Sequence, residues 1–203
     1  MGDTARNGSV SGRPMLSQAF ILDMRRIRVT HALAELCTEQ GYHETSVTDI
    51  VARAGMARNS FYEVFPNRQE TLLALFKRAS AELTAEVDHA CAKSPEEIPG
   101  LERALGAALV WVADNPHSAR ALLVEAPMLP AAHWCRLDFR AGLAERLARA
   151  MLGPGAEAEA REEMLIGGIC AVLRGRLLRG EEISPASLRE ELMGLIELSY
   201  GDS

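Results

Sequence analysis

The sequence predicts an all-α protein of about nine helices. Ala, Leu, Glu and Arg are abundant, whereas aromatic residues make up only 5% of the 203 residues, a balance that favours helices over strands. Apolar residues recur at intervals of three and four along most of the chain, and no alternating run is long enough for a useful strand. Glycines and prolines divide the chain into segments of helical length.

The N-terminal part of this pattern predicts a small three-helix domain over residues 17–67, after a disordered leader at residues 1–16. A first helix begins near Ser17, ends at Gln40 and is capped by Gly41. A second helix follows the segment GYHET, with Thr45 or Ser46 as its cap. Gly55 ends it, and a third, short helix covers residues 57–64 until Pro66 stops it.

The remaining residues, 68–203, predict a larger helical domain. A fourth, long helix starts after Asn67 and reaches Ala92. The proline-rich segments SPEEIPG and PMLP, the glycine-rich GPGA, and a Ser184-Pro185 helix start separate the later helices. These are expected at about residues 101–115, 116–126, 131–152, 157–179 and 185–200.

The charges are unevenly distributed between the two parts. The net charge of −6 by itself argues against a nucleic-acid-binding protein. However, residues 1–78 hold 10 Lys/Arg against 8 Asp/Glu, whereas residues 79–203 hold 12 against 20. Any affinity for a polyanion is therefore expected in the N-terminal domain.

The segment AGMARNSFYEVF, residues 54–65, has the features of a helix-turn-helix. Gly55 tolerates the positive φ of a tight turn, and the next helix has polar side chains at its front, where a recognition helix enters the major groove. An ordinary helix corner with solvated polar residues has the same spacing, so spacing alone leaves the two interpretations level.

Residues 28–76, RVTHALAELCTEQGYHETSVTDIVARAGMARNSFYEVFPNRQETLLALF, resemble the N-terminal domain of the tetracycline-repressor (TetR) family of bacterial transcription regulators. The matching parts are GYxxTS, DIVARAG, SFYxxF and FPNRQETL. The resemblance implies that Thr45, Tyr62 and Arg68 contact phosphates, that Arg58 is the basic residue at the front of the recognition helix, and that Asn59 and Ser60 face base edges. Glu63 and Val64 depart from the family pattern and put individual contacts in doubt.

Three arginines of the first helix are additional candidates. Arg25 and Arg26 are predicted to reach phosphates or an adjacent minor groove, although a solvated basic face has the same pattern. Arg28 has the alternative of pairing with an acid.

The resemblance also implies a ligand pocket enclosed by the fourth to seventh helices. Aromatic residues concentrate between residues 111 and 139, which suits a mostly apolar ligand, although plain core is the commoner role for each such residue. His117, Glu125, His133 and Arg136 are possible polar contacts, though surface positions are more common for them. The predicted apolar contacts are Trp111, Leu122, Met128, Trp134, Leu137, Phe139 and Met164.

The resemblance further implies that the last two helices pair with a second subunit. Small residues in the eighth helix permit close helix approach, and the ninth helix repeats leucines along one side. Packing of the same two helices inside a monomer is the alternative. The predicted interface is Gly167, Gly168, Ala171, Leu188, Leu192, Leu195 and Ile196.

We therefore expect a homodimeric, cytoplasmic regulator that binds a double-stranded DNA operator and a small-molecule effector, most simply as a repressor. An apolar-ligand carrier of the same fold that has lost DNA binding is the alternative, suggested by Glu63, Val64 and the net charge. We expect no catalytic, metal or cofactor site, because the five histidines form no metal or catalytic motif and the four cysteines no CxxC pair. An enzyme using a buried Cys or His is the third hypothesis. The sequence has no apolar stretch long enough to span a membrane and no apolar signal-peptide core at its start.

Overall fold

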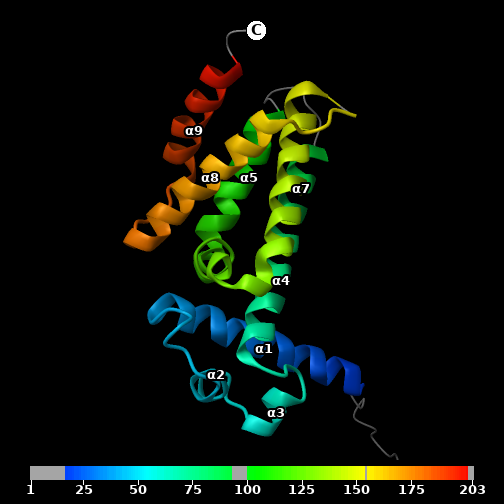
Figure 1. Ribbon diagram of the computed structural model, residues 1–203, viewed down its shortest axis with the longest axis vertical. Coiled ribbons are helices and arrows are strands. Elements are labelled where there is room, and N and C mark those ends of the chain that lie inside the picture. Colours follow the sequence, from blue (N-terminus) through cyan, green and yellow to red (C-terminus); the bar gives the residue numbers. More distant parts are fainter. Residues whose placement is uncertain (1–16, 93–99, 154, 201–203) are drawn as a thin grey trace, which may run out of the picture.

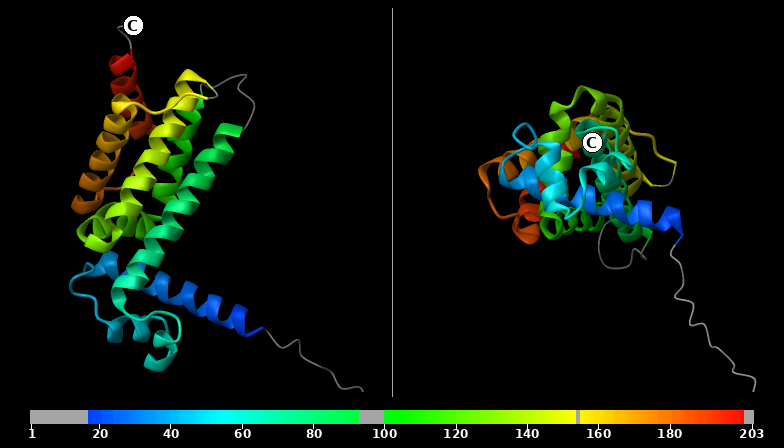
Figure 2. Two further views of the ribbon diagram at one scale, coloured as in Figure 1. Left: turned by 45° about the vertical axis from the view of Figure 1, so that its right-hand side comes forward. Right: turned by 90° about the horizontal axis from the view of Figure 1, so that it is seen from below.

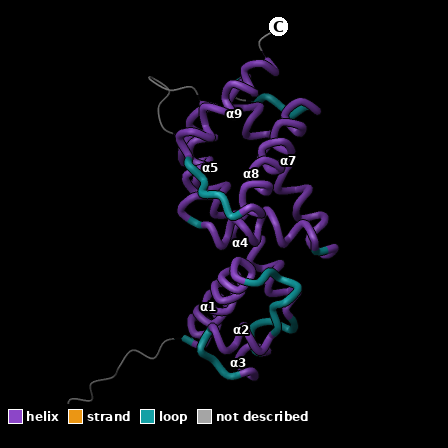
Figure 3. The backbone as a smooth tube through the Cα atoms, turned by 90° about the vertical axis from the view of Figure 1, so that its left-hand side faces the viewer, coloured by secondary structure: helices purple, strands orange, loops and turns teal. Residues whose placement is uncertain are grey.

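The computed structural model describes residues 17–92, 100–153 and 155–200; the predicted leader lies outside these ranges. Every regular element in them is a helix, as Figure 3 shows, which confirms the all-α fold class. None of these helices combines the length and the apolarity needed to cross a bilayer. The α-helices are α1 (Gln18–Glu39), α2 (Val47–Arg53), α3 (Arg58–Tyr62), α4 (Arg68–Ala92), α5 (Gly100–Asp114), α6 (Pro116–Arg120), α7 (His133–Leu152), α8 (Ala160–Arg179) and α9 (Pro185–Tyr200).

The helices form two groups joined by α4. Helices α1 to α3 lie at the lower end in Figure 1, and α5, α7, α8 and α9 lie at the other end (Figures 1 and 2). Helix α4 packs against α1 at its beginning and against α5 and α7 further along. The predicted boundary between residues 67 and 68 therefore falls at the start of a long helix that contacts both groups, and the short helix α6 also contacts α1 and α5.

The N-terminal group folds around a continuous apolar stripe on α1. Val29, Leu33 and Cys37 are fully buried there, together with Ile50 of α2 and Phe61 of α3. The hydroxyl of Ser17 caps α1 by accepting a hydrogen bond from the Phe20 N–H, at 3.2 Å. Gly41, with φ of 83°, follows the helix end in the predicted left-handed conformation.

The cap of α2 is Ser46, one of the two residues that the sequence offered. Its hydroxyl accepts a hydrogen bond from the Asp49 N–H, and the Asp49 carboxylate accepts one from the Ser46 N–H at 2.7 Å. This reciprocal pair is a capping box, and it satisfies two N–H groups at the helix start.

The segment after Pro116 departs from the predicted single helix to Ala126. Helix α6 ends at Arg120, the chain continues as a π-helical turn over Ala121–Glu125, and short 3₁₀ turns follow at Ala126–Met128 and Pro130–Ala132. Apolar periodicity does not distinguish a π turn from an α turn, so the sequence contained no signal for this change. The extra residue in the turn alters which side chains face the neighbouring helices.

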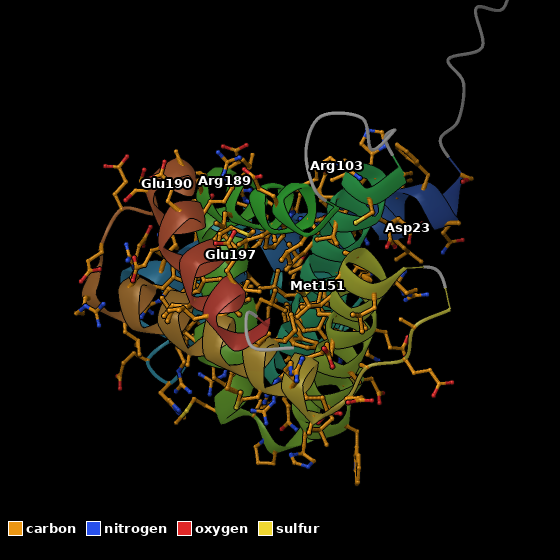
Figure 4. All side chains as sticks on the ribbon, turned by 90° about the horizontal axis from the view of Figure 1, so that it is seen from above. Asp23, Arg103, Met151, Arg189, Glu190 and Glu197 are labelled. Carbon is orange, nitrogen blue, oxygen red and sulfur yellow. The ribbon has the colours of Figure 1, made fainter. Side chains whose placement is uncertain are left out.

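Helix α9 packs against α5 within the same chain. The ion pair Arg189–Glu102, with Nη1 and Oε1 3.6 Å apart, joins these helices, and Figure 4 shows Arg189 on α9 at the side next to α5. Three residues predicted for the dimer interface, Leu188, Leu192 and Ile196, are buried in this intrachain contact. They belong to the core of the single chain, because their face of α9 is the one that covers α5.

Candidate nucleic-acid interface

The turn between α2 and α3 is held in place by a side chain from α1. The Arg28 guanidinium donates hydrogen bonds to the carbonyl oxygens of Ala54 and Gly55, the latter at 3.1 Å. Gly55 has φ of 60°, and a Cβ at this position would lie 3.4 Å from Arg28 Nη2. Arg28 therefore fixes the helix-turn-helix corner rather than pairing with an acid, and the turn both needs and has a glycine.

Helix α3 presents a polar outer face over one buried anchor. Phe61 is fully buried and contacts Phe65, with ring centroids 6.3 Å apart, so the helix cannot rotate freely about its axis. Arg58, Asn59 and Tyr62 are exposed, and Ser60 is half-buried. These four are the residues that the sequence assigned to DNA, and the fold places them together on one short helix at the end of the molecule (Figure 1).

Arg58 and Tyr62 are neighbours on this face. The Arg58 Nη2 atom lies 3.4 Å from the Tyr62 hydroxyl, and the guanidinium carbon is 5.9 Å from the ring centroid. Residues four apart in a helix share one side, which explains the contact. A guanidinium and a hydroxyl side by side are suited to donating hydrogen bonds to adjacent phosphate oxygens.

The two other arginines predicted to reach DNA are partly engaged by acids. Arg25 forms an ion pair with Glu63 at the end of α3, and Arg26 pairs with Asp23, at 3.0 Å. All four groups remain substantially exposed. The Glu63 charge, which departs from the family pattern, is thus offset by an arginine of the same domain. Val64, the other departure, is buried and faces the core.

Thr45 and Arg68, both predicted to contact phosphates, are used inside the domain. Thr45 is fully buried, and its hydroxyl donates to the carbonyl of Gly41, at 2.8 Å. Arg68 donates hydrogen bonds to the carbonyls of Tyr42, His43 and Thr45, and its guanidinium lies over the Tyr42 ring, 4.3 Å from the centroid. In this conformation both residues brace the loop before α2 instead of facing outward.

A buried polar cluster connects this domain to the rest of the chain. The carboxylate of Glu125, on the π turn, accepts a hydrogen bond from the Tyr42 N–H at 3.3 Å and lies 3.4 Å from Arg120 Nε. Arg120 also donates to the carbonyl of Cys37 in α1, at 3.0 Å, and to that of Leu177 in α8, at 3.1 Å. From the sequence, Glu125 was a candidate for a ligand contact or a surface group, because periodicity gives no indication of buried hydrogen bonds between the two domains.

Two neighbouring pockets open in the larger domain. The inner pocket, of about 80 Å³, is walled almost entirely by apolar side chains from α4, α5, α7, α8 and α9. The outer pocket, of about 460 Å³, lies between α4, the π turn, α7 and α8, and three arginines border it: Arg136, Arg140 and Arg174. Only Arg136 was a candidate from the sequence. Arg140 and Arg174 lie within helices whose sequence pattern is dominated by apolar residues.

The predicted ligand contacts separate into three groups. Phe139 lines both pockets, and Leu122 and Leu137 line the outer one. Trp111 is buried and faces a different cleft, between α4 and the start of α6. Met128, Trp134 and Met164 are exposed and border neither pocket; Trp134 is 73% exposed. The structure therefore brings three of the seven residues together.

Two of the four thiols, those of Cys37 in α1 and Cys170 in α8, are poorly suited to nucleophilic chemistry. Burial raises the pKa of Cys37 to about 12, and the nearby Glu125 carboxylate adds to the effect. Burial also raises the pKa of Cys170, against the opposing influence of Arg140. A nucleophilic cysteine requires a lowered pKa, so these environments favour a structural role.

Comparison with known proteins places the N-terminal domain in a sequence family. The family model described as "Bacterial regulatory proteins, tetR family" matches residues 29–75. The chain is 36% identical over 70 residues to the HTH-type dhaKLM operon transcriptional activator DhaS of Lactococcus lactis, covering 32% of this chain and 37% of that protein. It is 35% identical over 51 residues to the fatty acid metabolism regulator protein of Bacillus subtilis, covering 25% and 26%. These matches span little more than a third of the relatives at most.

Solved structures extend the similarity to nearly the whole chain. FadR from Bacillus halodurans has a TM-score of 0.73 at 15% identity, with 84% of this chain and 93% of that chain covered. A TetR-like regulator from Rhodococcus has a TM-score of 0.69 at 23% identity, with 91% and 96% covered. FadR from Bacillus subtilis in complex with stearoyl-CoA has a TM-score of 0.71 at 17% identity, with 83% and 96% covered. At these identities the similarity establishes the fold.

Proposed function

Because the chain is a member of the TetR family of bacterial regulatory proteins, we propose that it represses transcription as a homodimer and is released from a palindromic operator by a small, mostly apolar effector. The observation that carries the proposal is the outer face of α3, where Arg58, Asn59 and Tyr62 are exposed over a locked anchor, Phe61. The proposed site of action of the protein is chromosomal DNA in the cytoplasm.

We assign the DNA contacts from the exposure and the hydrogen-bonding groups of each side chain on α3. Arg58 and Tyr62 bind phosphates, while Asn59 and Ser60 read base edges in the major groove. Arg25 and Arg26 add positive charge beside the recognition helix. Both arginines are in exposed ion pairs, so each can exchange its carboxylate partner for a phosphate. Two such domains about one DNA turn apart fit a palindrome.

The dimer uses the outward faces of α8 and α9. Gly168 and Ala171 of the predicted set are exposed, as are the large apolar residues Met164, Leu195 and Leu198, the last to 80%. Exposed apolar side chains on two adjacent helices favour a helical partner surface. We expect Leu198→Glu to shift the protein toward monomer in light scattering, and Leu188→Val, an internal change, to leave the dimer intact.

The effector acts through a difference in its affinity for two conformations. It binds more tightly to a conformation with altered reader spacing, and it lowers DNA affinity by that difference. FadR of Bacillus subtilis holds stearoyl-CoA, whose long acyl chain belongs to the apolar class proposed here. The outer pocket, at about 460 Å³, has the size of a small-molecule site.

The experiment is a fluorescence anisotropy titration with DNA from upstream of the protein's own gene. We expect salt-sensitive, sequence-dependent binding that is lost in an Asn59→Ala, Tyr62→Phe double variant with unchanged circular dichroism. Equal affinity for unrelated DNA would overturn the proposal. Two of the three observations that suggested the carrier alternative are weakened, because Glu63 is paired with Arg25 and Val64 is buried.

A further inference from the structure

The outer pocket combines an apolar floor with a rim of positive charge. Phe76 of α4 and Phe139 of α7 form its aromatic wall, edge to face with ring centroids 6.0 Å apart. Arg136 and Arg140 of α7 and Arg174 of α8 stand around it. Three guanidinium groups beside one small pocket are unusual in a domain whose acids outnumber its bases.

None of these three arginines has a carboxylate within 4.0 Å among the described residues. Arg136 donates to the carbonyl of Pro127, at 2.7 Å, and Arg174 Nη2 lies 3.8 Å from the Met128 sulfur. By contrast, Arg146 and Arg176, on the same two helices, both hold carboxylates. Within the described part of the chain, no ion pair therefore neutralises these three guanidinium groups, which leaves them available to an anion.

The position of Arg140 depends on a missing side chain. A Cβ at Gly167 of α8 would lie 2.5 Å from Arg140 Nη2, which is too close for the guanidinium to remain where it is. A Cβ at Gly168, the next residue, would meet no neighbouring atom within 4 Å. Gly167 thus gives the Arg140 charge room to lie against α8 at the edge of the pocket.

The outer pocket adjoins the inner one through shared walls. Leu123, Phe139 and Cys170 line both, and the inner pocket is almost wholly apolar. A molecule that occupied both would place an apolar end toward the inner pocket and its other end among the arginines. Guanidinium groups bind carboxylate and phosphate oxygens in a bidentate manner, so that end would be anionic.

We propose that the effector is a single-chain amphipath with an anionic carboxylate or phosphate head, held by Arg136, Arg140 and Arg174, and with its alkyl chain against Phe76 and Phe139. This inference rests on the proposed effector function and adds the sign of the ligand's charge. The inner pocket, at about 80 Å³, admits only the end of the chain in this conformation.

The test is calorimetric titration of the full-length protein with octyl phosphate, octanoate, octanol and octyltrimethylammonium, which share one alkyl chain. We expect both anions to bind at least about tenfold more tightly than the neutral and cationic compounds, since a hydrogen bond to a charged group contributes about that factor. The two anions distinguish a phosphate head from a carboxylate head. Equal affinity for octanol and the anions would overturn the proposal.

Matched variants locate the head group. Arg140→Gln and Arg174→Gln should each weaken octyl phosphate about tenfold, while Arg149→Gln, an equal charge loss further along α7, should not. Gly167→Ala should weaken it as well, because the added methyl displaces the Arg140 guanidinium without removing charge, whereas Gly168→Ala should not. Identical affinities in the two glycine variants would contradict the assigned role of Arg140.

Two further readouts separate this inference from the function on which it rests. Anion-selective binding that leaves DNA affinity unchanged would support the site and refute its role as the effector site. Light scattering of the arginine variants addresses the remaining possibility. Loss of the dimer in Arg140→Gln or Arg174→Gln, with no anion binding by the parent protein, would assign these arginines to a partner subunit and overturn the proposal.

Discussion

Arg25 of α1 and Glu63 at the end of α3 form an ion pair across the face that carries the exposed residues of the recognition helix. The pair lies within the proposed DNA-binding surface, and Glu63 is half exposed. The Glu63 carboxylate would repel a DNA phosphate, and the ion pair keeps the Arg25 guanidinium from binding a phosphate. We therefore expect the pair to limit the affinity of the protein for DNA.

We expect Glu63→Gln to increase DNA affinity. The change removes a negative charge near the phosphates and frees Arg25 for them, so the dependence of log K on log[salt] should steepen by about one unit. Thermal stability should change little, because an exposed ion pair contributes at most about 1 kcal/mol. Anisotropy titrations at several salt concentrations measure the slope. Weaker binding by the variant would show that Glu63 contacts DNA or positions a residue that does.

Arg58→Ala and Arg68→Ala should have opposite consequences. Arg58 is exposed on α3, so its loss should flatten the salt slope by about one unit and leave the free energy of unfolding nearly unchanged. Arg68 donates to three loop carbonyls, so its loss should lower stability by about 1–3 kcal/mol. Urea denaturation and salt titration of both variants provide the comparison. A flattened slope in Arg68→Ala without loss of stability would restore the phosphate contact that the sequence predicted for it.

Glu125→Ala should weaken the connection between the two domains. The substitution leaves the Tyr42 N–H without its acceptor and the Arg120 guanidinium without its carboxylate, at a cost of about 1–3 kcal/mol. The matched control is Glu44→Ala, an exposed glutamate in the loop that contains Tyr42. Chemical denaturation measures both. A stability loss of equal size in the two variants would contradict a specific role for the buried carboxylate.

The Asp88–Arg146 pair joins α4 to α7 and should make stability depend on pH at the acid end. Hydrogen bonds from Arg146, at 2.7 and 2.8 Å, hold the pKa of Asp88 below its ordinary value. The pair therefore stabilises the fold above the unfolded-state pKa of about 3.9 and stops doing so as the pH falls through the lower folded-state pKa.

Asp88→Asn should consequently be less stable than the parent at pH 7, by less than about 1 kcal/mol because Asp88 is half exposed, and the difference should shrink as the pH falls below the unfolded-state pKa of about 3.9 towards the lower folded-state pKa. The control is Asp114→Asn, which alters an exposed aspartate of α5. Unfolding curves at pH 7, 5, 4 and 3 follow the difference. A gap that persists undiminished at pH 3 would exclude titration of Asp88 as its source.

The helices could be predicted because their signals are local. Ser17, Gly41 and Pro116 start or end helices through their own backbone chemistry, and apolar periodicity identifies the buried side of each helix. The contacts of α9 could not be predicted in this way. Leu188 and Leu195 are both leucines in one repeating pattern, yet the first is buried against α5 and the second is exposed. Apolar periodicity shows that one side of a helix will be buried. It does not show whether the burying surface belongs to the same chain or to a second subunit.

The candidate site follows the same division. Arg58, Asn59 and Tyr62 are exposed because a motif fixed their places around the Phe61 anchor. Arg68 carries the charge expected at its position, but its guanidinium donates hydrogen bonds to loop carbonyls. A long, flexible side chain can find such acceptors within its own domain, and the sequence does not indicate which ones. Arg140 drew no attention in the sequence, because its significance depends on Gly167, 27 residues away and on another helix.

Helix α4 has 25 residues, which corresponds to a rod of about 37 Å. Towards its C-terminal end it carries Leu83 and Val87, which line the inner pocket, and its other end begins beside the recognition helix. Tilting such a rod by about 5° displaces its tip by roughly 3 Å, and in the proposed dimer two-fold symmetry would double the change in separation between the two recognition helices. Successive base pairs are about 3.4 Å apart. A rotation too small to disturb the packing of the larger domain would thus put the two recognition helices out of phase with the double helix by more than one base pair.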